Sequence, residues 1–224
     1  MVNEPLGANS WKTKPTDRFV LKWIKCHLSA RITPQLVLVP WLRPWMITIS
    51  SAILGVLGGT VFALGSAWVA GLIAAVSQIL DGVDGQFARL TGRESTAGAF
   101  LDSVLDRFPD GAMVIGMVIY VIRLPVSLPL WLLLALGSLA LIGSNLISYS
   151  SARADCLGID LGKPTLASKG TRTTVMILCG LGSLIWPSMP IVAVGYLVVH
   201  PNLVVANRLI KVYKSSSPGS GADR

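Results

Sequence analysis

The chain has 224 residues, of which 52% are hydrophobic and 13% are charged, and its mean hydropathy is +0.64. A soluble domain carries about 25% charged residues, so this composition excludes an ordinary soluble protein and predicts an all-α integral membrane protein with one domain. The net charge of +8 could favour a nucleic-acid partner. The placement of the basic residues, described below, argues against that interpretation, and we expect no nucleic-acid partner.

Residues 1–16 are mostly polar, and we expect them to form a flexible N-terminus. This segment has no apolar core, so no cleavable signal peptide is predicted and the first membrane helix would direct insertion. From Asp17 onward, apolar side chains recur at helical spacing, and basic side chains lie largely opposite them. This pattern predicts an amphipathic helix in the membrane interface. A solvated helix packed on a partner is the alternative.

Six apolar stretches follow, and their lengths suit bilayer-spanning helices of about 20 residues. We expect these spans at about 43–64, 67–90, 97–122, 130–151, 171–185 and 189–209. Glycines in the first span, Gly55, Gly58 and Gly59, permit close contact between helices. The predicted membrane domain covers residues 17–212, and the polar residues 213–224 are expected to form a flexible tail. No internal repeat is evident, which weakens a transporter hypothesis.

The basic residues are distributed unevenly between the predicted loops. Of the 19 Lys and Arg residues, only Arg123 falls in a loop on the far side of the membrane. Loops rich in Lys and Arg face the cytoplasm. The sequence therefore predicts that both termini and the 91–96 turn are cytoplasmic, with contact to anionic membrane lipids as a consequence.

The segment from Asp81 to Asp110 places five aspartates between two apolar runs. Ionisable residues in membrane helices are functional-site candidates. Because a helix turns about 100° per residue, Asp81 and Asp84 share one face of the second span, and Asp102 and Asp106 share one face of the third. The turn at 91–96 is short enough to make these helices antiparallel neighbours. Four carboxylates are therefore expected to converge.

Carboxylates held this close repel one another unless a cation lies among them. Hard oxygen ligands favour Mg²⁺, Mn²⁺ or Ca²⁺ over zinc, and the segment contains neither Cys nor His. The cysteines at positions 26, 156 and 179 show no metal-binding spacing. A structural metal site and the ion pathway of a cation transporter are the alternatives to a catalytic metal centre.

The segment carries a spaced motif: Asp81-x-x-Asp84-Gly85-x-x-Ala88-Arg89, then Gly98-x-x-x-Asp102-x-x-x-Asp106. It resembles the signature of the CDP-alcohol phosphotransferases at all eight defining positions. Enzymes of this family transfer a phosphoryl-alcohol group from a CDP-alcohol to a second alcohol and release CMP. The resemblance covers roughly residues 14–212, and it implies a homodimer.

The resemblance also implies roles for individual residues. Asp81, Asp84 and Asp102 would bind Mg²⁺ or Mn²⁺, with Asp106 contributing and acting as the general base. The CDP-alcohol would be bound by seven residues of the motif: Asp81, Asp84, Gly85, Ala88, Arg89, Gly98 and Asp102. Among these, Arg89 would bind the pyrophosphate. Asp110 lies outside the signature and could either hydrogen-bond the site or meet a polar group of another helix, and Arg107 could form a structural ion pair.

The signature does not identify the acceptor, but three basic residues near the expected cytoplasmic mouth suggest a phosphorylated polyol. They are Arg153, at the end of the fourth span, and Lys169 and Arg172, which lie one helical turn apart at the start of the fifth. Ordinary cytoplasmic loop charge is the alternative. The segment around Arg153 resembles part of the phosphatidylinositol phosphate synthases, and the aspartate segment resembles di-myo-inositol phosphate phosphate synthases. Inositol phosphate is therefore the first expected acceptor. Glycerol 3-phosphate is the second, because residues 167–174 resemble, less closely, a segment of phosphatidylglycerophosphate synthases.

Overall fold

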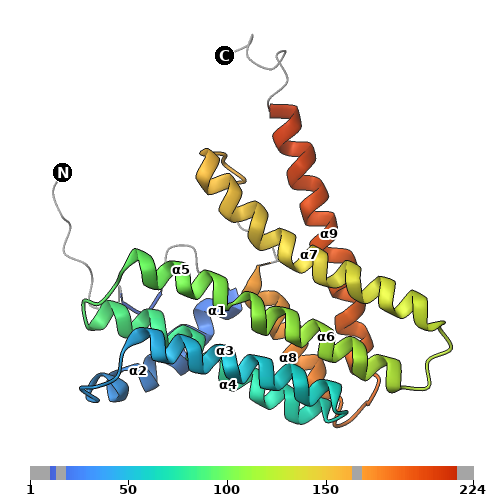
Figure 1. Cartoon of the computed structure of the whole chain (residues 1–224), viewed down its shortest axis with the longest axis horizontal. Coiled ribbons are helices and arrows are strands. Elements are labelled where there is room, and N and C mark those ends of the chain that lie inside the picture. The colour runs from blue at the N-terminus through green and yellow to red at the C-terminus, as the bar shows by residue number, and fades with distance from the viewer. Residues whose placement is uncertain (1–10, 14–18, 163–167, 216–224) are drawn as a thin grey trace.

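The computed structural model describes residues 11–13, 19–162 and 168–215 (Figure 1). Regular secondary structure in these ranges is entirely helical, which confirms the predicted all-α class. The elements are α1 (Phe19–Ile24), the π-helix η1 (Lys25–Ser29), α2 (Ala30–Val37), α3 (Pro44–Ala63), α4 (Ala67–Leu90), α5 (Thr96–Leu105), α6 (Arg107–Arg123), α7 (Leu130–Leu157), α8 (Lys169–Gly182) and α9 (Met189–Ser215). The predicted flexible termini lie mostly outside the described residues, although α9 continues to Ser215.

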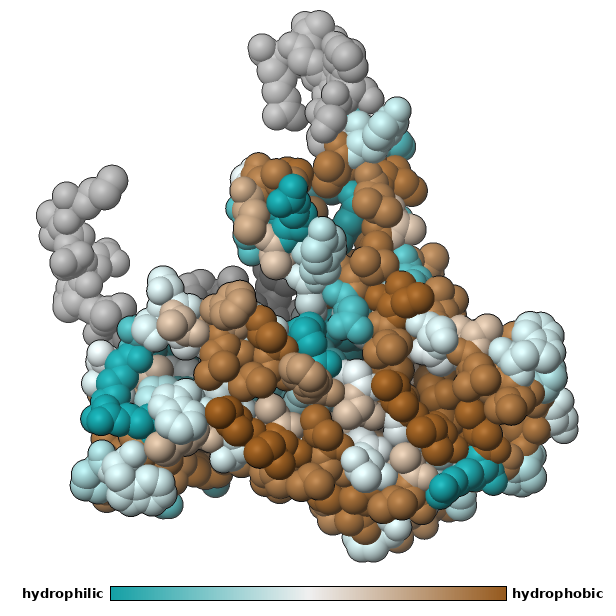
Figure 2. Space-filling view, in the orientation of Figure 1, coloured by the Kyte–Doolittle hydropathy of each residue, from teal (hydrophilic) through white to brown (hydrophobic). Residues whose placement is uncertain are grey.

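Within the described ranges, four helices are long and apolar enough to cross a membrane: α3, α4, α7 and α9. Large apolar side chains such as Phe100, Phe108 and Trp131 are exposed, and Figure 2 shows apolar residues covering much of one face. An exposed apolar surface of this extent is typical of contact with lipid rather than water. The protein is therefore an integral membrane protein. The predicted third and fifth spans correspond to shorter helices, α5 with α6 and α8.

The prediction of one continuous helix over 97–122 was wrong, because α5 ends at Leu105 and α6 begins at Arg107, although the backbone of Asp106 between them stays helical. Pro109 lies in the first turn of α6. It has no N–H to donate to the carbonyl of Leu105, and its ring crowds the preceding turn. The helices α5 and α6 still run roughly in line (Figure 1). The break therefore leaves Asp106 at the junction of two helices rather than within a regular helix.

Glycines bring α3 and α6 into backbone contact. A Cβ atom at Gly59 would clash with the backbone of Ala112, and one at Gly116 would clash with the backbone of Gly59. Gly55 lies directly against Pro109, so that a Cβ there would come 2.5 Å from the proline Cβ. Small residues at such crossings allow close helix packing in membranes. The expected role of the first-span glycines is confirmed for Gly55 and Gly59, which pack α3 against the helix that begins at the break.

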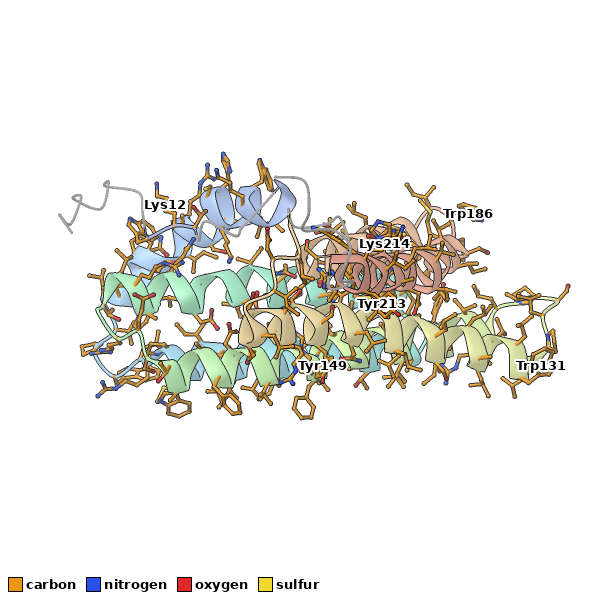
Figure 3. All side chains as sticks on the ribbon, turned by 90° about the horizontal axis from the view of Figure 1, so that it is seen from above. Lys12, Trp131, Tyr149, Trp186, Tyr213 and Lys214 are labelled. Atoms are coloured by element: carbon orange, nitrogen blue, oxygen red, sulfur yellow. The ribbon has the colours of Figure 1, made fainter. Side chains whose placement is uncertain are left out.

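The N-terminal helices form a layer along the bundle, best seen from above in Figure 3. Ser29 Oγ donates a hydrogen bond to the carbonyl of Ile79 at 2.8 Å. A Cβ at Gly82 would clash with Ser29, so only glycine lets η1 approach α4 this closely. This contact places the N-terminal layer against the helix that carries Asp81 and Asp84.

Candidate active site

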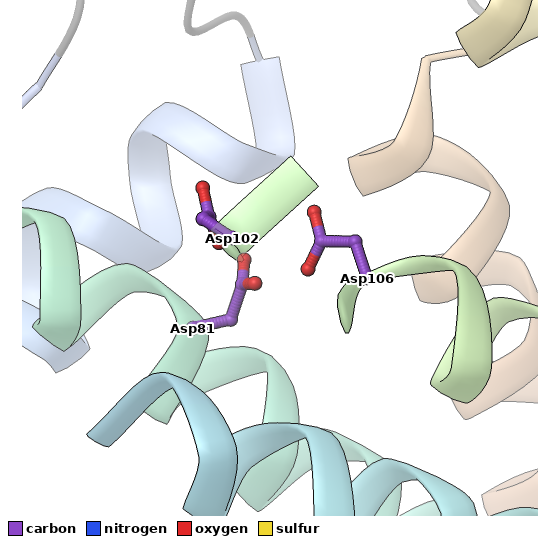
Figure 4. Close-up of side chains that lie close together, drawn as sticks. All are labelled: Asp81, Asp102 and Asp106. Carbon is purple, nitrogen blue, oxygen red and sulfur yellow. The ribbon is translucent and has the colours of Figure 1, made fainter. Parts of the chain in front are cut away.

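Three carboxylates converge where α4 meets the junction of α5 and α6 (Figure 4). Asp81, Asp102 and Asp106 each offer an oxygen, and these atoms lie within 4.8 Å of one another. Divalent cations bind carboxylate oxygens at about 2.0–2.6 Å, so one ion between these oxygens could contact all three. In the described part of the chain, these three form the group that could hold a metal ion. We call it the carboxylate cluster.

Asp84 lies outside the carboxylate cluster. Its Oδ2 accepts a hydrogen bond from Thr48 Oγ1 at 2.7 Å, and its Oδ1 accepts one from the Gly85 N–H. The side chain is buried and faces a neighbouring cavity, whose lining also includes Asp102. The four expected carboxylates are therefore divided, with three in the cluster and Asp84 on the cavity wall. Asp102 is common to both.

This cavity, about 490 Å³ in volume, lies between α3, α4 and α5. Its lining includes six of the eight signature residues: Asp84, Gly85, Ala88, Arg89, Gly98 and Asp102. Cavities of about 300–1,000 Å³ are typical of small-molecule sites. The Gly98 N–H is capped by Ser95 Oγ at 3.0 Å, which begins α5 at the cavity rim. Signature residues from two helices, α4 and α5, thus line one cavity, which we call the donor cavity.

Lys169, from the start of α8, extends into the carboxylate cluster. Its Nζ lies 2.8 Å from Asp81 Oδ1 and 2.6 Å from Asp106 Oδ1. The ammonium thus bridges two carboxylates of the cluster. Lys169, which we expected to face the mouth of the site, therefore brings its positive charge into the cluster itself.

Arg172 is also turned inward. Its side chain is 2% exposed, and its Nη2 lies 3.2 Å from Asp110 Oδ2. The same carboxylate oxygen meets Arg107 Nη1 at 3.0 Å, and that nitrogen also donates to Ser148 Oγ at 2.7 Å. Asp110 therefore binds Arg172 of another helix, α8, and Arg107 of its own helix forms the ion pair that was considered. Arg172 therefore contacts a buried carboxylate, whereas Lys169 contacts two half-buried ones.

Arg153 is exposed in the last two turns of α7, which extends beyond the predicted end at residue 151. Close to it lies Arg208 of α9, which the sequence did not single out. Arg208 Nη1 donates to the carbonyl of Ile147 at 2.9 Å and to the hydroxyls of Ser150 and Ser151 at 2.6 and 3.0 Å. The sequence signal for Arg208 was its position just before the end of an apolar span. In the sequence it could not be distinguished from the ordinary positive charge of a cytoplasmic loop.

In a helical membrane bundle, a carboxylate cluster beside a cavity of about 490 Å³ is the arrangement expected of a membrane enzyme that acts on phosphate esters with a bound metal ion. The match to one family is specific: residues 41–211 fit the model of the CDP-alcohol phosphatidyltransferases, and the chain belongs to this family. It is therefore a CDP-alcohol phosphotransferase. This result excludes the cation transporter as the alternative.

Curated relatives show which members of the family are similar. The phosphatidylinositol phosphate synthase of Cutibacterium acnes is 29% identical over 197 residues, which cover 84% of this chain and 89% of the relative. The archaetidylinositol phosphate synthase of Pyrococcus horikoshii is 33% identical over 141 residues, or 62% of this chain and 70% of the relative. A bifunctional IPC transferase and DIPP synthase of Thermococcus kodakarensis is 35% identical over 137 residues, or 61% of this chain and 30% of that longer protein.

Solved structures have the same fold. The phosphatidylinositol phosphate synthase of Mycobacterium tuberculosis with CDP-DAG bound superposes with a TM-score of 0.71 at 27% identity, covering 88% of this chain and 98% of that one. The same enzyme in complex with manganese and citrate gives a TM-score of 0.72 at 26% identity, over 88% and 93% of the two chains.

Proposed function

We propose that the protein transfers the phosphoryl-alcohol group of a CDP-alcohol to inositol phosphate and releases CMP. One observation carries this proposal: the carboxylate cluster lies beside a cavity lined by the signature residues, in a chain similar to synthases named for inositol phosphate products. Glycerol 3-phosphate is the second candidate acceptor. Choline and ethanolamine fit less well, because these cations would approach a site rich in Lys and Arg.

The residues present fit a divalent cation, Mg²⁺ or Mn²⁺. Asp81, Asp102 and Asp106 offer three hard oxygen ligands within 4.8 Å of one another. Asp84, on the adjoining wall, would complete the ligand set that the motif implies. A bound divalent cation would neutralise the charge of the donor pyrophosphate and the charge that develops on the phosphate of the leaving CMP.

The donor cavity holds the CDP-alcohol in this proposal. Arg89 binds its pyrophosphate, because a guanidinium presents paired N–H donors to phosphate oxygens. Gly85, Ala88 and Gly98 have side chains small enough to leave room for the cytidine nucleotide. Asp84 and Asp102 complete the binding surface where the cavity meets the cluster.

Asp106 acts as the general base in this proposal. Its carboxylate lies at the helix break, and Lys169 holds one of its oxygens at 2.6 Å. This contact fixes the direction of the carboxylate, so that the other oxygen can accept the proton of the acceptor hydroxyl. Holding the hydroxyl in line with the scissile phosphate would lower the entropic part of the barrier.

Arg153, Lys169 and Arg172 provide the positive charge for the acceptor phosphate. Arg153 is exposed and would contact the phosphate from α7. Lys169 contacts Asp106, so a phosphate near the ammonium would bring the hydroxyls of the polyol close to the base. Arg172, fixed by Asp110, would contribute charge from within the bundle.

Replacing Arg153 with Ala is expected to raise the KM for the acceptor. One charge-assisted hydrogen bond is worth about 1.5–3 kcal/mol, and 1.4 kcal/mol corresponds to tenfold. The expected increase is therefore roughly ten- to a hundredfold, with the KM for the donor nearly unchanged. Steady-state kinetics measure the effect. The control is Arg123→Ala, which removes an exposed arginine at the end of α6 that is farther from the carboxylate cluster. A change confined to the donor KM would refute this role.

The six-span arrangement is also part of the proposal. In it, α5 with α6 and α8 lie in the membrane with the four long helices, α1 to α2 lie in the interface, and both termini and the active site face the cytoplasm. In a cysteine-free background, Glu94→Cys and Asp160→Cys should react with an impermeant reagent from one side and Ser127→Cys from the other. Labelling of Glu94→Cys and Asp160→Cys from opposite sides would disprove the arrangement.

Light scattering in detergent tests the proposed homodimer, expected at twice the chain mass of 23.8 kDa.

The reaction itself is tested by incubating the purified protein with Mn²⁺, CDP-diacylglycerol or its archaeal ether-lipid counterpart, and one of three acceptors. These are inositol phosphate, glycerol 3-phosphate and unphosphorylated inositol, and mass spectrometry identifies the lipid product while CMP is measured in parallel. The proposal predicts the highest rate with inositol phosphate. Equal rates with free inositol would contradict a phosphorylated acceptor, and no CMP with any acceptor would contradict the proposed donor.

A further inference from the structure

Residues Trp11–Thr13, which we call the N-terminal strap, lie against the active-site helix α4. The carbonyl of Trp11 accepts a hydrogen bond from Arg89 Nε at 2.7 Å, and the carbonyl of Lys12 accepts one from Gln86 Nε2 at 2.8 Å. Gln86 and Arg89 lie about one turn apart on α4, within the signature segment. Two successive carbonyls of the strap therefore meet two side chains on one face of the helix.

Gln86 joins the strap to the rest of the N-terminal layer. Its side chain is 0% exposed. Besides Lys12, its Nε2 donates to the carbonyl of Lys25 in η1 at 2.9 Å, and its Oε1 accepts from Thr33 Oγ1 at 2.7 Å. A buried amide with both N–H groups and its oxygen bonded is costly to disturb. Gln86 therefore fixes the strap, η1 and α2 relative to α4.

The bond to Trp11 sets the orientation of the Arg89 guanidinium. A guanidinium carries five N–H donors in a rigid, planar fork. With Nε held by the strap, Nη1 and Nη2 lie over Gly85, at 3.5 and 3.8 Å from the position that a Cβ would take there. Gly85 and Arg89 both line the donor cavity. The strap therefore turns the paired nitrogens of the fork toward the cavity wall.

We propose that the N-terminal strap is a positioning element of the donor site, which holds Arg89 ready to bind the pyrophosphate of the CDP-alcohol through both terminal nitrogens. The inference rests on the proposed role of Arg89. A fork already held in its binding orientation loses less conformational freedom when the ligand binds. The Nζ of Lys12 also lies 5.5 Å from the centroid of the Trp11 ring, and this cation–π contact helps to hold the strap together.

A pair of truncations tests the strap. Deleting residues 2–10 keeps the carbonyls of Trp11 and Lys12, whereas deleting residues 2–13 removes them. Calorimetry with Mn²⁺ present measures the Kd of CDP, which contains the pyrophosphate, and of CMP, which does not. We expect the longer deletion to weaken CDP binding about tenfold relative to the shorter one, because CDP must then order the Arg89 side chain that the strap no longer holds. Between the same two truncations, the Kd of CMP should change less than about threefold.

A point variant of the full chain provides the second test. Gln86→Glu keeps an oxygen for Thr33 but places a carboxylate oxygen against the carbonyls of Lys12 and Lys25, so it should also weaken CDP binding more than CMP binding. Mn²⁺ affinity and the thermal midpoint report whether the fold is intact. Equal CDP affinity for the two truncations overturns the proposal, and so does equal loss of CDP and CMP affinity. Because these are binding measurements, a wild-type protein that binds CDP but releases no CMP from a CDP-alcohol would refute the proposed function and not the strap.

Discussion

Replacing Asp106 with Asn is expected to lower kcat by about 10²–10⁴, the usual contribution of a positioned general base. Asparagine has nearly the same shape and keeps an oxygen for the Lys169 ammonium, which lies 2.6 Å from Asp106 Oδ1. It cannot accept the proton of the acceptor hydroxyl. Since Asp106 also belongs to the carboxylate cluster, kcat must be measured at saturating Mn²⁺ so that weaker metal binding does not add to the loss.

The matched control is Asp160→Asn, which changes an exposed carboxylate that caps the Gly162 N–H after α7. It should leave kcat within about twofold, as expected for a surface substitution away from the site. CMP release with saturating donor and acceptor is the measurement. If Asp106→Asn turned over at the wild-type rate, Asp106 would not be the base.

Replacing Asp102 with Ala is expected to weaken divalent-cation binding by at least ten- to a hundredfold, the range reported even for groups that only support a metal ligand. Asp102 is common to the carboxylate cluster and the donor cavity. Its loss should therefore reduce both Mn²⁺ affinity and donor binding in the presence of Mn²⁺. The fold should persist, because removing one negative charge from a group of like charges relieves repulsion in the metal-free protein.

Electron paramagnetic resonance titration with Mn²⁺ measures the affinity without turnover, and a thermal melt without metal reports the stability of the fold. Asp160→Asn again serves as the control. Unchanged Mn²⁺ affinity in Asp102→Ala would remove Asp102 from the ligand set. A large fall in the metal-free melting temperature would show that Asp102 stabilises the fold instead.

The sequence predicted those features of the site that depend on local spacing. Steps of three and four residues placed the aspartates on facing sides of two helices joined by a short turn, so the convergence of Asp81, Asp102 and Asp106 could be expected, although Asp84 lies outside their cluster. Helical class and membrane insertion followed from composition in the same way. Four helices within the described ranges are long and apolar enough to span a membrane, and the six-span arrangement stays a prediction.

Features that depend on tertiary contacts could not be predicted. The break at Asp106 depends on Pro109, which packs against Gly55 of α3, a residue more than 50 positions earlier in the chain. Lys169 is 88 positions from Asp81 in the chain, yet it contacts that carboxylate. No periodicity links positions so far apart. The same holds for Gln86, whose buried amide joins Lys12, Lys25 and Thr33.

Anomalous diffraction at the manganese edge, from crystals of the protein grown with Mn²⁺ and CDP-diacylglycerol, tests the metal centre most directly. The account predicts a manganese peak within about 2.0–2.6 Å of oxygens from Asp81, Asp102 and Asp106, with the cytidine nucleotide in the donor cavity beside it. Manganese bound elsewhere, with these three carboxylates contacting only Lys169 and one another while the donor occupies the cavity, would contradict it.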